Sequence, residues 1–400
     1  MTDEKNLWSL SPYNQLPEIQ KELQGMPKKV KFYDTTLRDG EQSIGVSMDA
    51  ADKLKIAKAL AKAKVDRIEA GFPSSTDEDK AAVAQIVKEV KDAEIWGFAR
   101  CNVNDVKTCK ETGVRSLVCE IATSPIKMKA WDLTEEVILQ RIRQAVSFAK
   151  QEGLYVAFFA VDATRSTPEF LKKAYQTAVK DCGADEVVIV DTLGVATPEA
   201  MFHLTRMVKS WVDVPAAAHC HNDFGLAIAC SLGAVKAGAD SVHVTVNGLG
   251  EKTGNADLAE LAMALHGLYG VDMNIDFKEL YALSRLVRDI SRVPISPLKP
   301  VVGDTVFVRE TGSVVAQLLN YPPSVEGYPP ELLGREREIV LSKKSGRKSV
   351  EYFLDREGIS LPPQKVDSLL GEVKKLGIKK KGLVSQTEFR ELAETVARTA

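Results

Sequence analysis

Two histidines at a spacing of two residues, His219 and His221, are the part of this sequence best suited to chemistry. On a β-strand, that spacing puts both imidazoles on the same face. Two imidazoles with a carboxylate or amide oxygen from other strands suit a divalent ion. The chain has 5 histidines, and the other three stand in contexts that favour structural roles: His203, His243 and His266. The pair predicts a metal site; the alternative is two polar side chains that solvate a strand end.

Two further segments carry groups that can complete such a site. Arg38 and Asp39 directly follow the first predicted strand, where the carboxylate can ligate an ion and the guanidinium can polarise a carbonyl or clamp a carboxylate. The alternative is an ion pair within the loop. The segment 248–254 is rich in glycine, which lets backbone approach a ligand closely, and Glu251 and Asn255 can face a site from it.

These residues are far apart in the chain, so they need a scaffold that brings strand ends together. From residue 30 onward, short β-branched runs alternate with amphipathic segments. Eight strands alternating with eight helices over roughly 240 residues predict an α/β fold, a (β/α)8 TIM barrel. An open doubly wound sheet is the alternative, and the lack of a GxGxxG motif after the first strand disfavours it. The predicted strands are Val30–Thr36, Arg67–Phe72, Glu94–Arg100, Arg115–Ala122, Tyr155–Asp162, Glu186–Thr192, Ala216–Asn222 and Ser241–Asn247.

In a TIM barrel the active site lies where strands end and the following loops begin. Polar residues at these ends are therefore candidates for substrate binding, and they include Arg100, Asp162 and Thr192. We expect a polar leader over residues 1–29, the catalytic barrel over 30–275, and a linker with a mainly helical C-terminal subdomain over 276–400. In that subdomain Ser385 and Glu388 form a capping-box pattern before an amphipathic run.

The composition is that of an ordinary globular protein. The apolar fraction is 44%, the charged fraction is 27% and the net charge is -2, so no global charge attracts nucleic acid or membrane. No apolar run approaches the roughly 18 residues that a membrane span needs. The acidic start does not resemble a secretory signal, and the 6 scattered cysteines do not resemble a disulfide framework. We expect a cytoplasmic protein that acts on small molecules.

Four motifs in this order resemble the DRE-TIM metallolyase superfamily, and most closely its isopropylmalate, homocitrate, citramalate and Re-citrate synthases. They are DTTLRDGEQ at 34–42, EAGFP at 69–73, HCHND at 219–223 and GLGEKTGNADL at 248–258. The resemblance runs from about residue 30 to about residue 350. It implies metal ligation by Asp39, His219 and His221, with Asn255 as a further oxygen ligand, and an enolate- or alkoxide-stabilising role for Arg38. It also implies that the 2-oxo acid contacts Gln42, Glu69 and Thr192.

The chemistry implied by the resemblance is a Claisen-type condensation of an acyl-CoA, with acetyl-CoA expected, and a 2-oxo acid. The family usually takes a catalytic histidine from a segment after the barrel, but the matching stretch here is Arg309-Glu310-Thr311-Gly312-Ser313-Val314. Glu310, Tyr321 and Glu251 are the alternative bases. Arg309 is a candidate for binding an extra carboxylate or a CoA phosphate, the alternative being an exposed arginine. Ala157 and Val161 replace charged residues of relatives, which predicts a reshaped oxo-acid pocket.

Two other hypotheses stay open beside the synthase. One is a carbon–carbon lyase, which the absence of a cysteine in the loop after the last barrel strand disfavours. The other is a paralogue with altered chemistry, because the usual histidine is absent. The ion is expected to be Mn²⁺ or Mg²⁺, with Zn²⁺ as an alternative, since oxygen ligands stand beside two imidazoles. The layout implied by the resemblance is that of a homodimer.

Overall fold

The computed structural model describes residues 8–398, which divide into two compact units. The first unit is Pro12–Ile295. The second contains the described residues up to Ser11 and those from Ser296 onward. The sequence prediction put this boundary after residue 275. The compact unit extends further because α11 (Leu280–Ser291) packs on the barrel, where Ser284 and Asn247 exchange hydrogen bonds of 2.6 and 2.9 Å.

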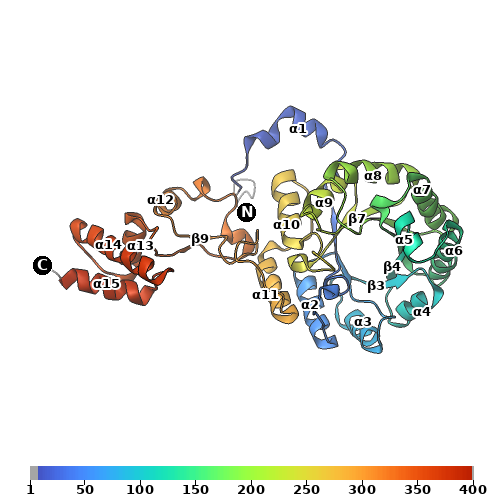
Figure 1. Ribbon diagram of the computed structural model, residues 1–400, viewed down its shortest axis with the longest axis horizontal. Coiled ribbons are helices and arrows are strands. Elements are labelled where there is room, and N and C mark those ends of the chain that lie inside the picture. The colour runs from blue at the N-terminus through green and yellow to red at the C-terminus, as the bar shows by residue number, and fades with distance from the viewer. Residues whose placement is uncertain (1–7, 399–400) are drawn as a thin grey trace. The chain divides into compact units, whose positions relative to one another are not determined.

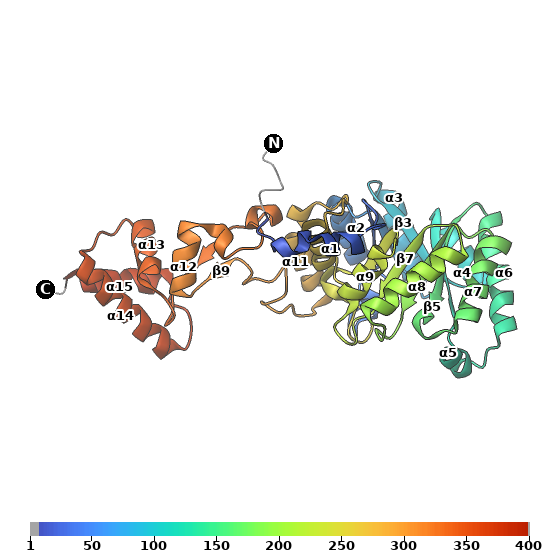
Figure 2. The same ribbon diagram turned by 90° about the horizontal axis from the view of Figure 1, so that it is seen from above.

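Eight parallel strands close into a barrel, and Figures 1 and 2 show helices around its outside. Closure pairs the first strand with the last, from Lys31 opposite Ser241 to Asp34 opposite Val244. The predicted (β/α)8 fold is therefore confirmed. The strands are β1 (Lys31–Asp34), β2 (Arg67–Glu69), β3 (Glu94–Arg100), β4 (Ser116–Ala122), β5 (Tyr155–Val161), β6 (Glu186–Asp191), β7 (Ala216–Cys220) and β8 (Ser241–Val244).

Helices join the strands, and most of them follow a residue whose side chain accepts a backbone N–H hydrogen bond from the first turn. Asp49, Thr76, Asn102 and Thr197 act in this way, each satisfying one of the unpaired amides of a first turn. The helices of this unit are α1 (Pro17–Glu22), α2 (Ala50–Lys62), α3 (Asp77–Glu89), α4 (Val103–Glu111), α5 (Pro125–Ala130), α6 (Glu135–Gln151), α7 (Pro168–Gln176), α8 (Pro198–Trp211), α9 (Ala227–Lys236), α10 (Leu258–Met263) and α11.

The interior of the barrel is filled with side chains from alternate strand positions, as the period of two requires. Aromatic rings dominate the middle layer: Tyr33 packs edge-on against Trp96, and its ring stacks on His243 with centroids 4.1 Å apart. The buried cluster is completed by Phe98, Val118, Ala157, Phe159, Val188, Val190 and Ala217. The barrel is thus a packed core, and space for chemistry exists only at its ends.

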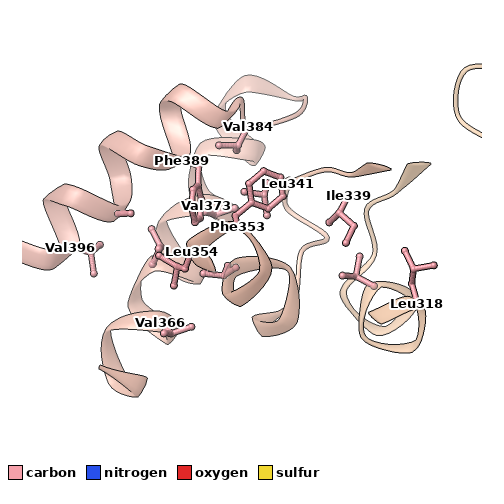
Figure 3. Packing of buried hydrophobic residues seen from close by; sticks show 14 residues of the cluster. Leu318, Ile339, Leu341, Phe353, Leu354, Val366, Val373, Val384, Phe389 and Val396 are labelled. Carbon is pink, nitrogen blue, oxygen red and sulfur yellow. The ribbon is translucent and has the colours of Figure 1, made fainter. Parts of the chain in front are cut away.

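The second unit is mainly helical, as predicted. Its helices are α12 (Gly312–Asn320), α13 (Arg347–Glu357), α14 (Pro363–Lys380) and α15 (Gln386–Arg398), with two short parallel strands, β9 (Val308–Arg309) and β10 (Glu338–Ile339). It has its own apolar core, drawn in Figure 3, which includes Leu341, Val373 and Phe389. The predicted capping box is confirmed, since Ser385 and Glu388 hydrogen-bond each other's backbone N–H at 2.8 and 3.3 Å. None of the helices described here has the length and apolar character of a membrane span.

Candidate metal centre

Three buried side chains from two distant parts of the sequence meet at the C-terminal end of the barrel. Asp39 lies in the turn that follows β1, His219 is on β7, and His221 follows β7 directly. Asp39 Oδ2 lies 3.2 Å from His219 Nε2 and 3.7 Å from His221 Nε2, and the two Nε2 atoms are 3.4 Å apart. The ligand atoms of these three residues all lie within 4.8 Å of one another. Among the described residues, they form the group of acidic and histidine side chains that could hold one metal ion.

The turn that carries Asp39 is built by the backbone. β1 ends at Asp34, two residues before the predicted end, because the chain turns directly after the last hydrogen bond to β8, which Thr35 N donates to Val244 O. The amides of Arg38, Asp39 and Gly40 all donate to the Thr35 carbonyl, at 3.2, 2.9 and 3.1 Å. This tight turn points the Asp39 carboxylate across the barrel mouth toward β7.

Asn255 lies beside the cluster, and its backbone forms an isolated antiparallel β-bridge with that of His221. Asn255 Nδ2 donates to Leu249 O at 3.0 Å, whereas the buried Asn255 Oδ1 has no hydrogen-bond partner among the described residues. Gly250 has a φ of +153°, and a Cβ there would collide with Asn255 Nδ2. The glycine-rich loop is therefore needed for close backbone approach. An acceptor oxygen left unpaired beside two imidazoles and a carboxylate fits a further metal ligand.

The donor set also fits an ion by its spacing. Ligand atoms about 2.1 Å from one ion, in tetrahedral or octahedral directions, lie roughly 3–3.4 Å apart. The separation of the imidazole Nε2 atoms and the shorter carboxylate contact lie in or near that range. Two imidazoles with carboxylate and amide oxygens suit a divalent cation of intermediate hardness.

Electrostatics keep Asp39 and His221 in the protonation states that a cation requires. Burial opposes ionisation of Asp39, but Arg38 beside it and the hydrogen bond with His219 hold the pKa of that carboxyl well below its usual range. Burial and the neighbouring His219 lower the pKa of His221 to about 3. Its ring is therefore neutral at physiological pH, with a nitrogen lone pair available.

Arg38 lies next to the cluster and is held from several sides. Its Nε donates to Glu69 Oε2 at 2.7 Å, its Nη1 lies 3.2 Å from Asp39 Oδ2, and its guanidinium carbon stands 4.4 Å from the centroid of the Phe98 ring. Its buried Nη2 has no hydrogen-bond partner in the described part of the chain. A fixed guanidinium with an unused donor can stabilise a developing oxyanion.

The other predicted substrate-binding residues of the barrel differ in what they contact. Glu69 is buried and accepts hydrogen bonds from Tyr33, Thr35 and Arg38, so protein groups engage both of its oxygens. Gln42 is exposed in the short 3-10 turn Gly40–Gln42. Their proposed contacts with an oxo acid stay predictions.

Three predicted residues occupy the ends of β3, β5 and β6. Arg100 is paired with Asp105 at 2.7 and 3.1 Å, and its side chain is largely exposed. Asp162 is buried and accepts both hydrogen bonds of Arg165, at 2.8 and 2.7 Å. Thr192 Oγ1 accepts from the Asp162 amide at 2.8 Å. All three therefore have protein partners at the barrel rim.

The candidate bases and Arg309 fall in two places. Glu251 is exposed, and its amide donates to Asp39 Oδ1 at 3.4 Å. In the second unit, Arg309 donates to the backbone carbonyls of Val306, Val308 and Val325, and Glu310 pairs with Lys344 at 2.7 Å. Burial by itself would raise the pKa of Glu310, but hydrogen bonds from Lys344 and Ser342 lower this pKa below its ordinary value. The lower pKa weakens Glu310 as a base. Tyr321, also in the second unit, is 62% exposed.

Glu120 on β4 is a residue that the sequence analysis overlooked. It stands two positions after Val118, which belongs to the barrel interior, so its side chain shares that inward face near the C-terminal end. Burial, with Glu69 adding to its effect, raises the pKa of Glu120 to about 7 against the opposing charge of Arg38. The period of two along β4 was the signal that could have found it.

A closed eight-stranded barrel with such a cluster at its C-terminal end defines a protein built to hold a ligand or ion where its strands end. Residues 29–287 match the HMGL-like family model, and residues 301–381 match the homocitrate synthase post-HMGL domain-like model. The chain belongs to the HMGL-like family, whose members among its relatives are DRE-TIM metallolyases.

Its relatives carry several synthase names. The chain is 41% identical to homocitrate synthase AksA of Methanopyrus kandleri, over 96% of each chain. It is 43% identical to the 2-isopropylmalate synthase of Sulfurisphaera tokodaii, over 87% of this chain and 91% of that one. It is 42% identical to the (R)-citramalate synthase CimA of Methanocaldococcus jannaschii, over 87% and 71%. The HMG-CoA lyase of Bacillus subtilis shares the fold, with a TM-score of 0.62 at 18% identity over 69% of this chain and 98% of that one.

Proposed function

We propose that this protein condenses an acyl-CoA, and specifically acetyl-CoA, with a 2-oxo acid to give a 2-hydroxy diacid or triacid and free CoA. The observation that carries the proposal is the Asp39, His219 and His221 cluster beside an arginine with an unused donor. The synthase names of relatives at about 40% identity support it. In the balanced reaction the acyl α-carbon loses a proton and bonds to the ketone carbon, and water cleaves the thioester.

Asp39, His219 and His221 would hold the divalent ion, with Asn255 Oδ1 as a further oxygen ligand. Such an ion supplies Lewis-acid chemistry for the ketone of a 2-oxo acid. Mn²⁺ or Mg²⁺ is our proposal for it, because two of the donor groups are oxygens and the expected substrate also offers oxygens.

Arg38 is proposed to direct its free Nη2 at the oxygen on which negative charge develops. Glu69 fixes the orientation of that guanidinium through the 2.7 Å contact with Nε, and Phe98 supports its face. Because Arg38 and Glu69 are both buried, little reorganisation is needed when charge appears. Glu251 is our candidate in the barrel unit for accepting the α-proton. It is exposed, and its backbone amide donates a hydrogen bond to Asp39 of the cluster.

A thiol-release assay tests the proposal. Purified protein with Mn²⁺ and acetyl-CoA is presented with pyruvate, 2-oxoisovalerate, oxaloacetate and 2-oxoglutarate, and free CoA thiol is followed. We expect release with at least one acid and its loss in His219→Ala. His203→Ala is the matched control, since His203 is exposed on α8, and it should keep both Mn²⁺ binding and activity. Thiol release with none of the acids would instead favour the paralogue with altered chemistry.

Assembly and location belong to the same proposal. We propose a homodimer in the cytoplasm, working in amino-acid biosynthesis, in line with the synthase names of the relatives. Light scattering on the purified full chain measures the assembly directly, and a mass near that of one 43.8 kDa chain would rule out the dimer.

A further inference from the structure

We propose that Glu120 and the apolar side chains around it make this site selective for a 2-oxo monocarboxylic acid with an apolar side chain. A 2-oxo acid that carries a second carboxylate is disfavoured. The inference rests on the proposed function and narrows its substrate class.

Glu120 lies near the C-terminal end of β4, at the end of the barrel that carries the candidate metal centre. Strand pairing puts it opposite Arg100 of β3 on one side and opposite Phe159 of β5 on the other. The Phe159 ring contacts the His219 ring, with centroids 5.2 Å apart, so Glu120 is one strand away from a neighbour of the candidate metal centre. Its side chain is half-buried on the inward face of β4.

Apart from Arg100, which Asp105 holds, the inward side chains of the two strands beside Glu120 are apolar. Phe98 comes from β3, and Ala157, Phe159 and Val161 occupy the three successive inward positions of β5. None of these side chains can pair with a carboxylate, and all of them favour contact with an apolar group. The substituent of the oxo acid therefore meets hydrocarbon on two strands and a carboxyl group on the strand between them.

The cations at this end of the barrel are already engaged. Arg100 is bound to Asp105, and Arg165 is bound to Asp162, each through two nitrogen atoms. Lys252 donates to Thr192 O at 3.0 Å and lies 3.6 Å from Asp223 Oδ2. Arg38 has one free donor, which the reacting end of the substrate requires. Recruiting one of the paired cations for a second carboxylate would leave its present acid partner uncompensated.

Glu120 itself adds a direct penalty for a second carboxylate. No hydrogen bond or ion pair links its side chain to another residue of the described chain, and the charges that act on it do so at longer range. Burial raises its pKa to about 7, so at pH 8 the carboxyl is mostly ionised. A second carboxylate at this level would then face a like charge in a partly desolvated site.

Substrate competition tests the inference. At pH 8 with Mn²⁺ and acetyl-CoA, kcat/KM for 2-oxoisovalerate or pyruvate should exceed that for 2-oxoglutarate and oxaloacetate by about tenfold or more, or about 1.4 kcal/mol. In Glu120→Gln the ratio of dicarboxylate to monocarboxylate kcat/KM should rise about tenfold, because the like charge is removed. Glu111→Gln is the matched control, since Glu111 is exposed on α4 and paired with Lys80, and it should leave the ratio unchanged.

The outcomes separate this inference from the proposed function. A wild-type preference for a dicarboxylic 2-oxo acid overturns the inference while supporting the synthase, and so does an unchanged ratio in Glu120→Gln. If no acid releases thiol, calorimetric titration of the Mn²⁺-loaded protein with the same acids still decides it. Tighter binding of the monocarboxylates supports the inference, and tighter binding of the dicarboxylates overturns it.

Discussion

The two ends of the barrel interior both bury charged groups, yet they treat them in opposite ways. At the N-terminal end, Arg67 donates to Glu186 at 2.7 Å and to Glu94 at 3.0 Å, and Ser241 and Tyr155 donate to Glu186 at 3.0 and 3.3 Å. None of these side chains contains a buried polar atom without a partner. At the C-terminal end, in contrast, Arg38 Nη2 and Asn255 Oδ1 are buried beside the candidate metal centre without a hydrogen-bond partner among the described residues.

The N-terminal network serves the fold alone, whereas the C-terminal groups are left available for a ligand. A buried charge is costly unless its partners are all present, and the N-terminal network meets that condition within the protein. The C-terminal groups do not meet it, so the fold tolerates a cost there that a bound ion and substrate can offset. Burial alone therefore does not mark a site, whereas unsatisfied donors and acceptors that converge on one point do.

The largest effect is expected from Glu186→Ala at the N-terminal end. It leaves the Arg67 guanidinium buried without its main partner, which costs about 3–5 kcal/mol in unfolding free energy. Chemical denaturation of the metal-free protein measures this loss. Mn²⁺ affinity of the folded fraction should not change, and a parallel loss of affinity would show that the two ends are coupled.

Asp39→Asn should have the opposite profile. It removes the negative ligand of the cluster, so Mn²⁺ affinity should fall by more than the 10- to 100-fold typical of residues that only support ligands, on the order of 100-fold or more. Calorimetric titration measures the change. In the metal-free protein the stability should fall far less than in Glu186→Ala. Unaltered Mn²⁺ affinity would remove Asp39 from the ligand set.

Arg38→Lys sharpens the contrast within the C-terminal end. Lysine keeps the charge but loses the fork that contacts Glu69 and Asp39 together, so kcat should fall about 100-fold while Mn²⁺ binding persists. Steady-state thiol release and Mn²⁺ titration separate the two effects. A change confined to KM would mean that Arg38 binds substrate without stabilising the transition state.

The smallest effect is expected from Ser241→Ala, which removes one hydrogen bond to Glu186 Oε1 and keeps the ion pair with Arg67. We expect a loss of about 1 kcal/mol in unfolding free energy with activity unchanged. Differential scanning calorimetry detects it as a small drop in Tm. A loss as large as that of Glu186→Ala would mean that the network fails as a whole when any member is removed.

Much of the fold was predictable because its signals are local. The alternation of β-branched runs with amphipathic segments predicted the barrel, and capping residues such as Ser385 predicted a helix start. Strand ends were less predictable. β1 stops at Asp34 because the Thr36 amide donates to Asp34 Oδ1 and three later amides donate to the Thr35 carbonyl, and the alternation of apolar residues does not mark where such a turn begins.

The sequence by itself determined which side chains share a face, as with His219 and His221, because the period of a strand is a local property. It also determined, through strand order, that Asp39 would reach the same end of the barrel. Only the tertiary structure decided which of these groups are already satisfied. Arg100 is occupied by Asp105 while Arg38 and Asn255 keep an atom free, since hydrogen-bond satisfaction depends on distances between side chains that the chain order does not contain.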